Sequence, residues 1–224
     1  AYGGHPISFG KDYLIPKPLD PRLITRISPA VAKAAMDSGV AKKKITDWDA
    51  YEEDLNRRVG SDQRLVSRVM SRAKKNPKRV VFAEADHVKI LKAAAIAMED
   101  GICIPILLGN QDKIKKLISE HKIELDGCEV LDPNEEHTLR AKYGEILYEK
   151  RKRKGVNKID GNKLMLGRNY FGAGMVEAGD ADAFISGLTR DYPSTISPAL
   201  QIIGKSDDTH RVAGMYIMQT KMGP

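Results

Sequence analysis

A cluster of hydroxyl and guanidinium side chains lies between two apolar segments of the sequence. It falls in the stretch GDADAFISGLTRDYPSTISPALQIIGK, residues 179–205. Hydroxyl and guanidinium groups at this density can bind phosphate oxygens, so the cluster predicts a site for a phosphate-bearing ligand. The alternative is an ordinary turn whose Ser and Thr side chains cap the next helix, and composition leaves both interpretations open. The cluster comprises Thr189, Arg190, Tyr192, Ser194, Thr195 and Ser197.

The flanking segments indicate which elements position this cluster. Residues 183–186 form an apolar run that predicts a strand ended by Gly187, and residues 198–203 predict the start of a helix. In open α/β sheets, ligands lie beyond the carboxyl ends of strands, where loops and the positive ends of helices converge. We therefore expect the cluster to occupy a loop between a strand and a helix.

Segments before this stretch predict the rest of a parallel sheet. Residues 79–83 and 104–108 are compact apolar strands, and residues 88–98 between them show apolar positions at helical spacing. Such a strand, helix and strand form a right-handed parallel βαβ unit. The alternation continues with helices at 113–120 and 135–154 and a strand at 128–131. The sequence therefore predicts an α/β fold with a doubly wound parallel sheet.

Two further groups of residues could carry chemistry. Glu84, Asp86 and His87 follow the first strand and are expected at the same edge of the sheet as the hydroxyl cluster. His87 could act as an acid–base group, although such a histidine is more often exposed or a helix cap.

Five basic residues, 150–154, end the long helix before Gly155. A solvated helix end explains this run through the helix dipole, while a clamp for cofactor phosphates and a nucleic-acid patch are alternatives. Aromatic residues do not alternate with the basic ones, which argues against nucleic acid.

The Gly-Ala-Gly sequence at 172–174 is superficially similar to a dinucleotide-binding loop. It lacks the third glycine and follows a helical pattern at 164–171 instead of a strand. Close helix packing explains these glycines better.

Composition sets the general class of protein. With 224 residues the chain can bury a sizeable core. The net charge of +7 fits a polyanionic partner or a lysine-rich solvated surface equally well. Cys103 and Cys128 show no metal-binding or disulfide spacing, which indicates reduced thiols in the cytoplasm. No apolar run reaches the roughly 20 residues of a membrane span. Because the sequence starts with Ala1 and stops just after an apolar run at 212–218, we expect a fragment cut at both ends.

The first part of the sequence predicts an extended segment and three helices. Residues 1–28 are rich in Gly and Pro, and Ser28-Pro29 is typical of the start of a helix that ends at Gly39. Thr46 is expected to cap a linker helix at 46–58, with Trp48, Tyr51 and Leu55 packing on one face. A third helix is expected from 62 to 76, after a boundary at 60–62.

Two separate stretches resemble known families. Residues 179–205 resemble phosphotransacetylases, in the SGLTRxYP form of the domain fused to bacterial multidomain NADP-dependent malic enzymes. The segments YLIPKPLDPRL and SPAVAKAAMDSGVA are similar to the last strand and closing helix of the malic-enzyme cofactor domain. The resemblance implies three parts: the end of an NAD(P)-binding domain at 1–45, a linker helix at 46–61, and a truncated phosphotransacetylase-like domain at 62–224.

The resemblance also implies binding residues. The helix end at 149–155 matches the E-x-R-K-x-K-G pattern of phosphotransacetylases, which implies that Arg151 holds a phosphate of coenzyme A. No catalytic residue is expected within the sequence, because the family's Ser and Asp pair would follow Pro224. The acyl-CoA and phosphate-binding residues predicted in this way are Arg151, Lys154, Thr189, Arg190, Tyr192, Ser194 and Thr195.

The sequence departs from the phosphotransacetylase pattern at two loops. In the E-G-x-D-x-R-like loop, Ala85 replaces Gly and His87 and Lys89 replace Asp and Arg. Asp191 lies in the segment that usually reads H-S-T, and Ser197 replaces the usual Arg. These changes should weaken phosphate binding, so we expect a domain that binds acetyl-CoA without turning it over.

For the intact protein the resemblance implies oxidative decarboxylation of malate to pyruvate and CO2 by a homo-oligomeric malic enzyme. NADP and Mg2+ or Mn2+ would be bound by an upstream domain, acetyl-CoA would act as a regulator, and the fragment alone would be inactive. An active phosphate acetyltransferase is the first alternative, and a basic nucleic-acid-binding domain is the second.

Overall fold

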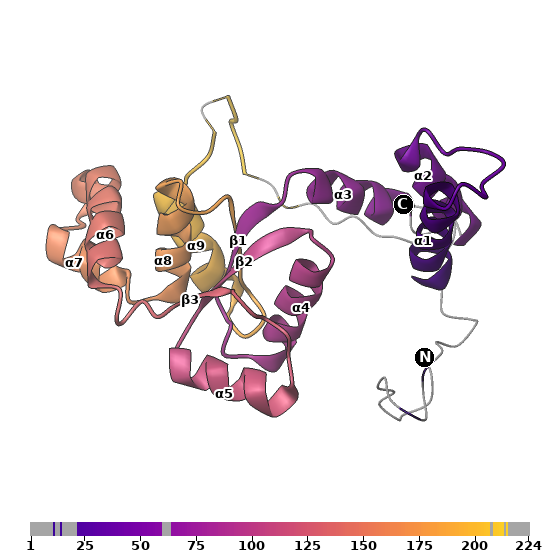
Figure 1. Cartoon of the computed structure of the whole chain (residues 1–224). Coiled ribbons are helices and arrows are strands. Elements are labelled where there is room, and N and C mark those ends of the chain that lie inside the picture. The colour runs from indigo at the N-terminus through magenta and orange to yellow at the C-terminus, as the bar shows by residue number, and fades with distance from the viewer. Residues whose placement is uncertain are drawn as a thin grey trace. The chain divides into compact units, whose positions relative to one another are not determined.

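The structure is a computed structural model of the chain and describes residues 11, 14, 22–59, 64–206, 208–212 and 214. The chain forms two compact units, which divide in sequence between Met70 and Ser71. In chain order (Figure 1) the elements are α1 (Arg22–Asp37), α2 (Trp48–Val59), α3 (Arg64–Lys75), β1 (Lys78–Phe82), α4 (Val88–Glu99), β2 (Cys103–Leu108), α5 (Gln111–His121), β3 (Glu129–Leu131), α6 (His137–Arg151), the 3-10 turn η2 (Lys152–Lys154), α7 (Lys158–Leu164), α8 (Arg168–Glu177), β4 (Ala183–Ile185) and α9 (Tyr192–Ile202).

The first unit is built on the contact between α1 and α2. Leu55 of α2 is buried, with only 3% of its surface exposed. The rings of Trp48 and Tyr51 meet edge to face with their centroids 5.9 Å apart. Packing against each other is the role that the sequence predicted for these aromatic side chains.

Two helix starts in the first unit differ from the sequence prediction. α1 begins at Arg22 and contains Pro29, although Pro29 was expected at the first helical position. A proline inside a helix removes one backbone donor and does not by itself end the helix, so the Ser-Pro signal was misleading. In α2 the cap is Asp47, whose Oδ1 accepts from the Ala50 N–H at 2.9 Å, and not Thr46. Most of the extended segment predicted for residues 1–28 lies outside the described residues.

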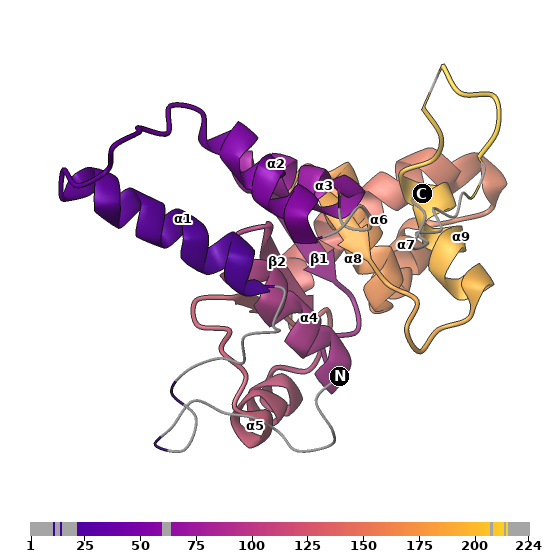
Figure 2. The same ribbon diagram turned by 90° about the vertical axis from the view of Figure 1, so that its right-hand side faces the viewer.

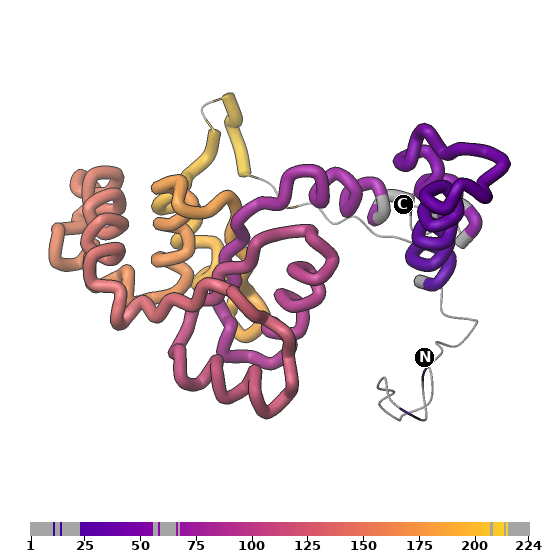
Figure 3. Tube along the Cα trace, in the orientation of Figure 1, coloured from indigo at the N-terminus to yellow at the C-terminus, as the bar shows by residue number. Residues whose placement is uncertain are grey.

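The second unit contains a four-stranded sheet in the order β3-β2-β1-β4. All three pairings are parallel, with Val81 of β1 opposite Ile106 of β2 and Phe184 of β4. The trace in Figure 3 runs outward from β1 to β3 before the chain crosses to β4 on the other side of β1. The predicted parallel α/β fold is confirmed.

Helices cover both faces of this sheet because successive residues of its central strands are apolar and point to opposite faces. Val80, Phe82 and Leu107 point into a core with α4 and α5. Val81, Ile106 and Leu108 point into the opposite core with α6, α8 and α9. Figures 1 and 2 both show α4 and α5 on the opposite side of the sheet from α8 and α9.

Close contacts at four glycines set the spacing of these helices. A Cβ added to Gly172 of α8 would lie 2.6 Å from the Phe184 ring, and one added to Gly174 would lie 2.7 Å from Tyr143 Cβ. At the crossing of α6 and α7, a Cβ on Gly161 would lie 2.6 Å from the Gly144 carbonyl oxygen. The interpretation of the Gly-Ala-Gly sequence as a packing motif is confirmed.

Several element boundaries in the second unit correct the sequence prediction. α9 begins at Tyr192, six residues before the expected start at 198, with Asp191 as its cap and a proline in its first turn. α7 was not predicted, and the helical pattern at 164–171 is divided by the break before α8. The long helix expected at 135–154 is α6 followed by the turn η2.

Candidate functional site

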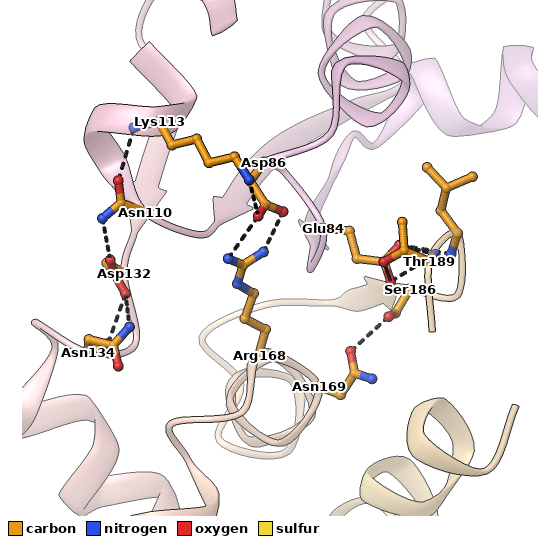
Figure 4. Close-up of polar contacts among 11 residues, drawn as sticks. Glu84, Asp86, Asn110, Lys113, Asp132, Asn134, Arg168, Asn169, Ser186 and Thr189 are labelled. Atoms are coloured by element: carbon orange, nitrogen blue, oxygen red, sulfur yellow. Dashed lines mark hydrogen bonds and ion pairs between the residues drawn. The ribbon is translucent and has the colours of Figure 1, made fainter. Parts of the chain in front are cut away.

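The second unit has its topological switch point between β1 and β4. From β1 the chain proceeds through β2 to β3 and then returns to form β4 on the other side of β1. Loops leaving the two strands therefore diverge at the carboxyl edge, which is where ligands bind in open α/β sheets. Figure 4 shows the polar side chains that gather at this edge.

Glu84 joins the two diverging loops. It follows β1, is only 5% exposed, and accepts hydrogen bonds from the Leu188 N–H at 2.8 Å and the Thr189 N–H at 3.1 Å. The Thr189 hydroxyl also donates to the carboxylate, at 3.2 Å. A buried carboxylate is stabilised by donors of this kind, so Glu84 fixes the turn after β4 to the end of β1 (Figure 4).

The same turn is held from α8 by an amide side chain. The Ser186 hydroxyl donates to Asn169 Oδ1 at 2.8 Å, and Asn169 Nδ2 donates to the Ser194 carbonyl at 2.9 Å. Asn169 thus connects the end of β4 to the first turn of α9. The sequence prediction missed Asn169, whose only signal is its position two residues after Gly167, at the start of a glycine-rich helix.

Asp86 forms the centre of an ion-pair group beside Glu84. Its carboxylate accepts two hydrogen bonds from Arg168, at 2.6 and 3.2 Å, and one from Lys113 Nζ at 3.1 Å. The hydrogen bond from Arg168 is the main cause that lowers the pKa of Asp86 from 3.8 to about 2. The group connects the loop after β1 to the first turns of α5 and α8 (Figure 4). Arg168 was not predicted as part of the site.

The other predicted residue of this loop, His87, is a helix cap. Its Nδ1 accepts from the Lys89 N–H at 3.2 Å at the start of α4. This contact confirms the capping alternative for His87. Next along the edge, the buried Asp132 accepts from the N–H and the side-chain amide of Asn134, at 3.0 and 2.8 Å, and so closes the turn after β3.

The predicted hydroxyl cluster is divided between a loop and the first turn of α9. Asp191 caps this helix: its carboxylate accepts from the Ser194 N–H at 3.3 Å and from the Ser194 hydroxyl at 2.6 Å. These bonds from Ser194 lower the pKa of Asp191. The Thr195 hydroxyl donates to the Asp191 carbonyl at 3.1 Å. The alternative interpretation of the cluster made Ser and Thr side chains the caps of the helix, but the cap is Asp191, and Ser194 and Thr195 donate to it from the first turn.

Two members of the cluster extend into solvent. Arg190 is exposed at the tip of the turn, and 75% of the Tyr192 surface is exposed. Thr189 precedes Arg190 on the same turn. Its hydroxyl proton is not directed at a ligand, because it donates to Glu84.

The basic run lies at the other end of α9. Lys150 Nζ donates to the Ile202 carbonyl at 2.6 Å and Arg151 Nε to the Gln201 carbonyl at 3.3 Å, which places cations at the negative end of the helix. Lys154 is exposed. A helix rises 1.5 Å per residue, so Tyr192 and Gln201 are separated by roughly 14 Å along α9. The seven predicted binding residues therefore form two groups, one at each end of this helix.

Within the described ranges, no group of three or more His, Cys, Asp or Glu side chains is arranged to hold a metal ion. No helix in that part of the chain is long and apolar enough to cross a membrane.

Comparisons with known proteins agree with this geometry. The family model for phosphate acetyl/butaryl transferase matches residues 64–223. The NADP-dependent malic enzyme of Salmonella typhimurium is 38% identical over 226 aligned residues, which cover 100% of this chain and 30% of that protein. The NADP-dependent malic enzyme of Rhizobium meliloti is 36% identical, with 97% of this chain and 29% of that protein covered. The chain thus spans less than a third of the length of these relatives.

A solved structure also matches a large part of this chain. The EutD phosphotransacetylase from Staphylococcus aureus superposes with a TM-score of 0.59 and 26% identity, covering 65% of this chain and 44% of that chain. The resemblance to bacterial malic enzymes that carry a fused phosphotransacetylase-like domain is confirmed. From its matched residues, its parallel sheet and its structural neighbour, we conclude that this chain belongs to the phosphate acetyl/butaryl transferase family.

Proposed function

We propose that the intact protein is an NADP-dependent malic enzyme in which this chain supplies a phosphotransacetylase-like domain that binds acetyl-CoA as a regulator. The observation that carries the proposal is the similarity of the whole chain to NADP-dependent malic enzymes, including the part before residue 64 that the transferase family model does not match. Oxidative decarboxylation of malate to pyruvate and CO2, with NADP and Mg2+ or Mn2+, would belong to a part of the protein outside this sequence.

The hydrogen bonds of the turn favour binding without acetyl transfer to phosphate. Transfer to inorganic phosphate needs donors that are directed at an incoming anion. The hydroxyls of Thr189, Ser194 and Thr195 each have one proton, and each proton is directed at an acceptor of this chain. Asp191 also places a carboxylate at the start of α9, where it would repel a phosphate.

Acetyl-CoA suits the separation of the two groups of predicted residues. Coenzyme A is an elongated molecule with phosphates near one end and the thioester at the other. Arg151 and Lys154 could meet its phosphates at one end of α9, while Arg190 and Tyr192 lie beside the turn at the other end. A ligand of this length could contact both groups of residues, although they lie at opposite ends of α9.

The experiment uses the intact protein and measures NADPH formation from malate with and without acetyl-CoA, together with calorimetric titration of acetyl-CoA. We expect binding and a change in the malate rate. Arg190→Ala should weaken binding about tenfold, as expected for loss of one charge-assisted contact of about 1.4 kcal/mol. The exposed Arg72→Ala on α3 is the control for net charge and should bind normally. Absence of acetyl-CoA binding would contradict the proposal.

An active phosphate acetyltransferase is the second candidate, favoured by the family to which the chain belongs. It predicts rapid formation of acetyl phosphate when the intact protein receives acetyl-CoA and inorganic phosphate. Rapid formation would replace the regulatory proposal, whereas binding without product would support it. The cytoplasmic location and the homo-oligomeric assembly stay predictions of the sequence.

A further inference from the structure

The carboxylate of Glu84 is buried at the switch point. Only 5% of the residue is exposed, and its two oxygens accept from Leu188 and Thr189 at the distances given above. All of these donors belong to the turn after β4. Glu84 is therefore committed to this turn and is not directed at solvent.

The backbone that carries Glu84 is fixed on both sides. The Ala83 N–H donates to the Ile185 carbonyl at 3.1 Å, and the Ala85 N–H donates to the Leu108 carbonyl at 3.3 Å. Glu84 thus stands on a segment bonded to β4 on one side and β2 on the other. A side chain on such a rigid support can define the geometry of a loop that has little packing of its own.

The turn is held at its two ends, where Ser186 bonds Asn169 and Asp191 caps α9, and Glu84 bonds the residues between them. Gly187 has a φ of +112°, and Leu188 is 44% exposed. Thr189 and Arg190 are also exposed. Without Glu84, the N–H groups of Leu188 and Thr189 could turn toward water, and the direction of Arg190 would no longer be defined.

We propose that Glu84 is the positioning residue of this turn, holding Leu188 and Thr189 so that Arg190 is presented to the acyl carbonyl at the thioester end of the bound acyl-CoA. This inference rests on the proposed function, since it names the residue that prepares the same site. Glu84 acts through the turn and does not touch the ligand. It also occupies the two backbone N–H groups, so the ligand must be recognised by side chains instead.

Three variants of the intact protein test the role of Glu84. Glu84→Ala removes every acceptor and should raise the Kd for acetyl-CoA at least about tenfold. Glu84→Gln keeps one oxygen for the backbone N–H groups and should stay within about threefold of the unchanged protein. Thr189→Val removes only the hydroxyl and should also have a small effect. The control is Glu145→Ala, which removes a carboxylate paired with Lys158 at 2.8 Å on α6.

Amide hydrogen exchange at Leu188 and Thr189 gives a second readout that needs no ligand. We expect exchange at both amides to accelerate at least about tenfold in Glu84→Ala and to be largely restored in Glu84→Gln. Equal Kd values in Glu84→Ala and the unchanged protein would overturn the proposal, and so would equal losses in the Ala and Gln variants. If the unchanged protein fails to bind acetyl-CoA, the proposed function fails, and the positioning role is then decided by amide exchange alone.

Discussion

Asp86 shows how one side chain can connect three parts of the switch point. Its hydrogen bonds to Arg168 and Lys113 favour the charged carboxylate, and this lowers the pKa of Asp86 from 3.8 to about 2. A carboxylate whose pKa is lowered by folding stabilises the folded state only while it is ionised. The stabilisation is therefore complete above pH 4 and is lost as the pH falls toward 2.

Asp86→Asn tests this linkage. At pH 7 the free energy of unfolding should fall by about 2 kcal/mol, because one pKa unit corresponds to about 1.4 kcal/mol and the site is partly exposed. The difference between the two proteins should shrink between pH 4 and pH 2. Chemical denaturation at several pH values measures it.

Glu145→Gln is the control for Asp86→Asn, because its exposed pair with Lys158 should contribute little to the free energy of unfolding. A loss in Asp86→Asn that is equally large at pH 2 would show that packing, and not charge, explains the effect.

Single residues were the least predictable level of the site. Glu84 was placed correctly at the edge of the sheet, because a polar residue directly after an apolar strand indicates its position. Its partners Leu188 and Thr189 lie more than a hundred residues away, and no local pattern relates them. Arg168 and Asn169 were missed for the same reason, since their contacts exist only after the sheet has formed.

At the scale of elements, the packing of α8 on β4 depends on the missing side chain of Gly172. A Cβ at this position would lie 2.6 Å from the Phe184 ring and 3.4 Å from Val81 Cγ1. Alanine is favoured over glycine in a helix by about 1 kcal/mol. Gly172→Ala can therefore destabilise the fold only if the crowding against Phe184 costs more than this preference.

We expect Gly172→Ala to lower the free energy of unfolding by about 1–3 kcal/mol, as overpacked cores do. In a Phe184→Leu background the same substitution should cost less, because the smaller side chain leaves room for the methyl group. A double-mutant cycle by denaturant unfolding measures this coupling. Equal costs in the two backgrounds would show that Phe184 is not the obstacle.

Lys150 of α6 connects the C-terminal end of α9 to α8. Lys150 Nζ donates to Glu177 of α8 at 2.5 Å and to the Ile202 carbonyl at 2.6 Å, so it connects three helices. Lys150→Met should lower the free energy of unfolding by about 1–2 kcal/mol, because it removes a cation from a helix end and leaves Glu177 unpaired.

Lys152→Met is the matched control, since Lys152 pairs only locally, with Glu149 three residues before it. It should leave the free energy of unfolding nearly unchanged, because an exposed ion pair contributes little. Thermal unfolding of the two variants provides the comparison, and equal shifts would contradict the role of Lys150.

Elements were predicted well where the hydrophobic period was strong. Strands β1, β2, β3 and β4 were each located to within one residue at every end, because short buried runs bounded by Gly or Asp are distinctive. The predicted start of α9 was wrong because the sequence holds two successive helix-start signals, Asp191 with Pro193 and Ser197 with Pro198. Either can begin a helix, and only the packing of the helix decides between them.

At the scale of the whole molecule, the net charge of +7 raises the question of nucleic acid. Within the basic run, Lys150 and Lys152 form ion pairs and Arg151 donates to a helix carbonyl. Carboxylates of the chain thus pair with two of the run's five charges, and the remaining three are too few for tight binding of DNA. We expect only weak, salt-sensitive binding of a DNA oligonucleotide, measured by fluorescence anisotropy. Submicromolar affinity at physiological salt would contradict this prediction.

The crossing of α6 and α7 limits which substitutions can persist at its two glycines. Gly161 and Gly144 approach so closely that an added Cβ at either position would lie within 3 Å of the facing backbone. Every single-base change in a glycine codon that alters the protein gives a residue with a β-carbon or a stop signal. Selection should therefore remove substitutions at Gly144 and Gly161. Invariance at these two positions would reflect a contact between two backbones and not the binding of a ligand.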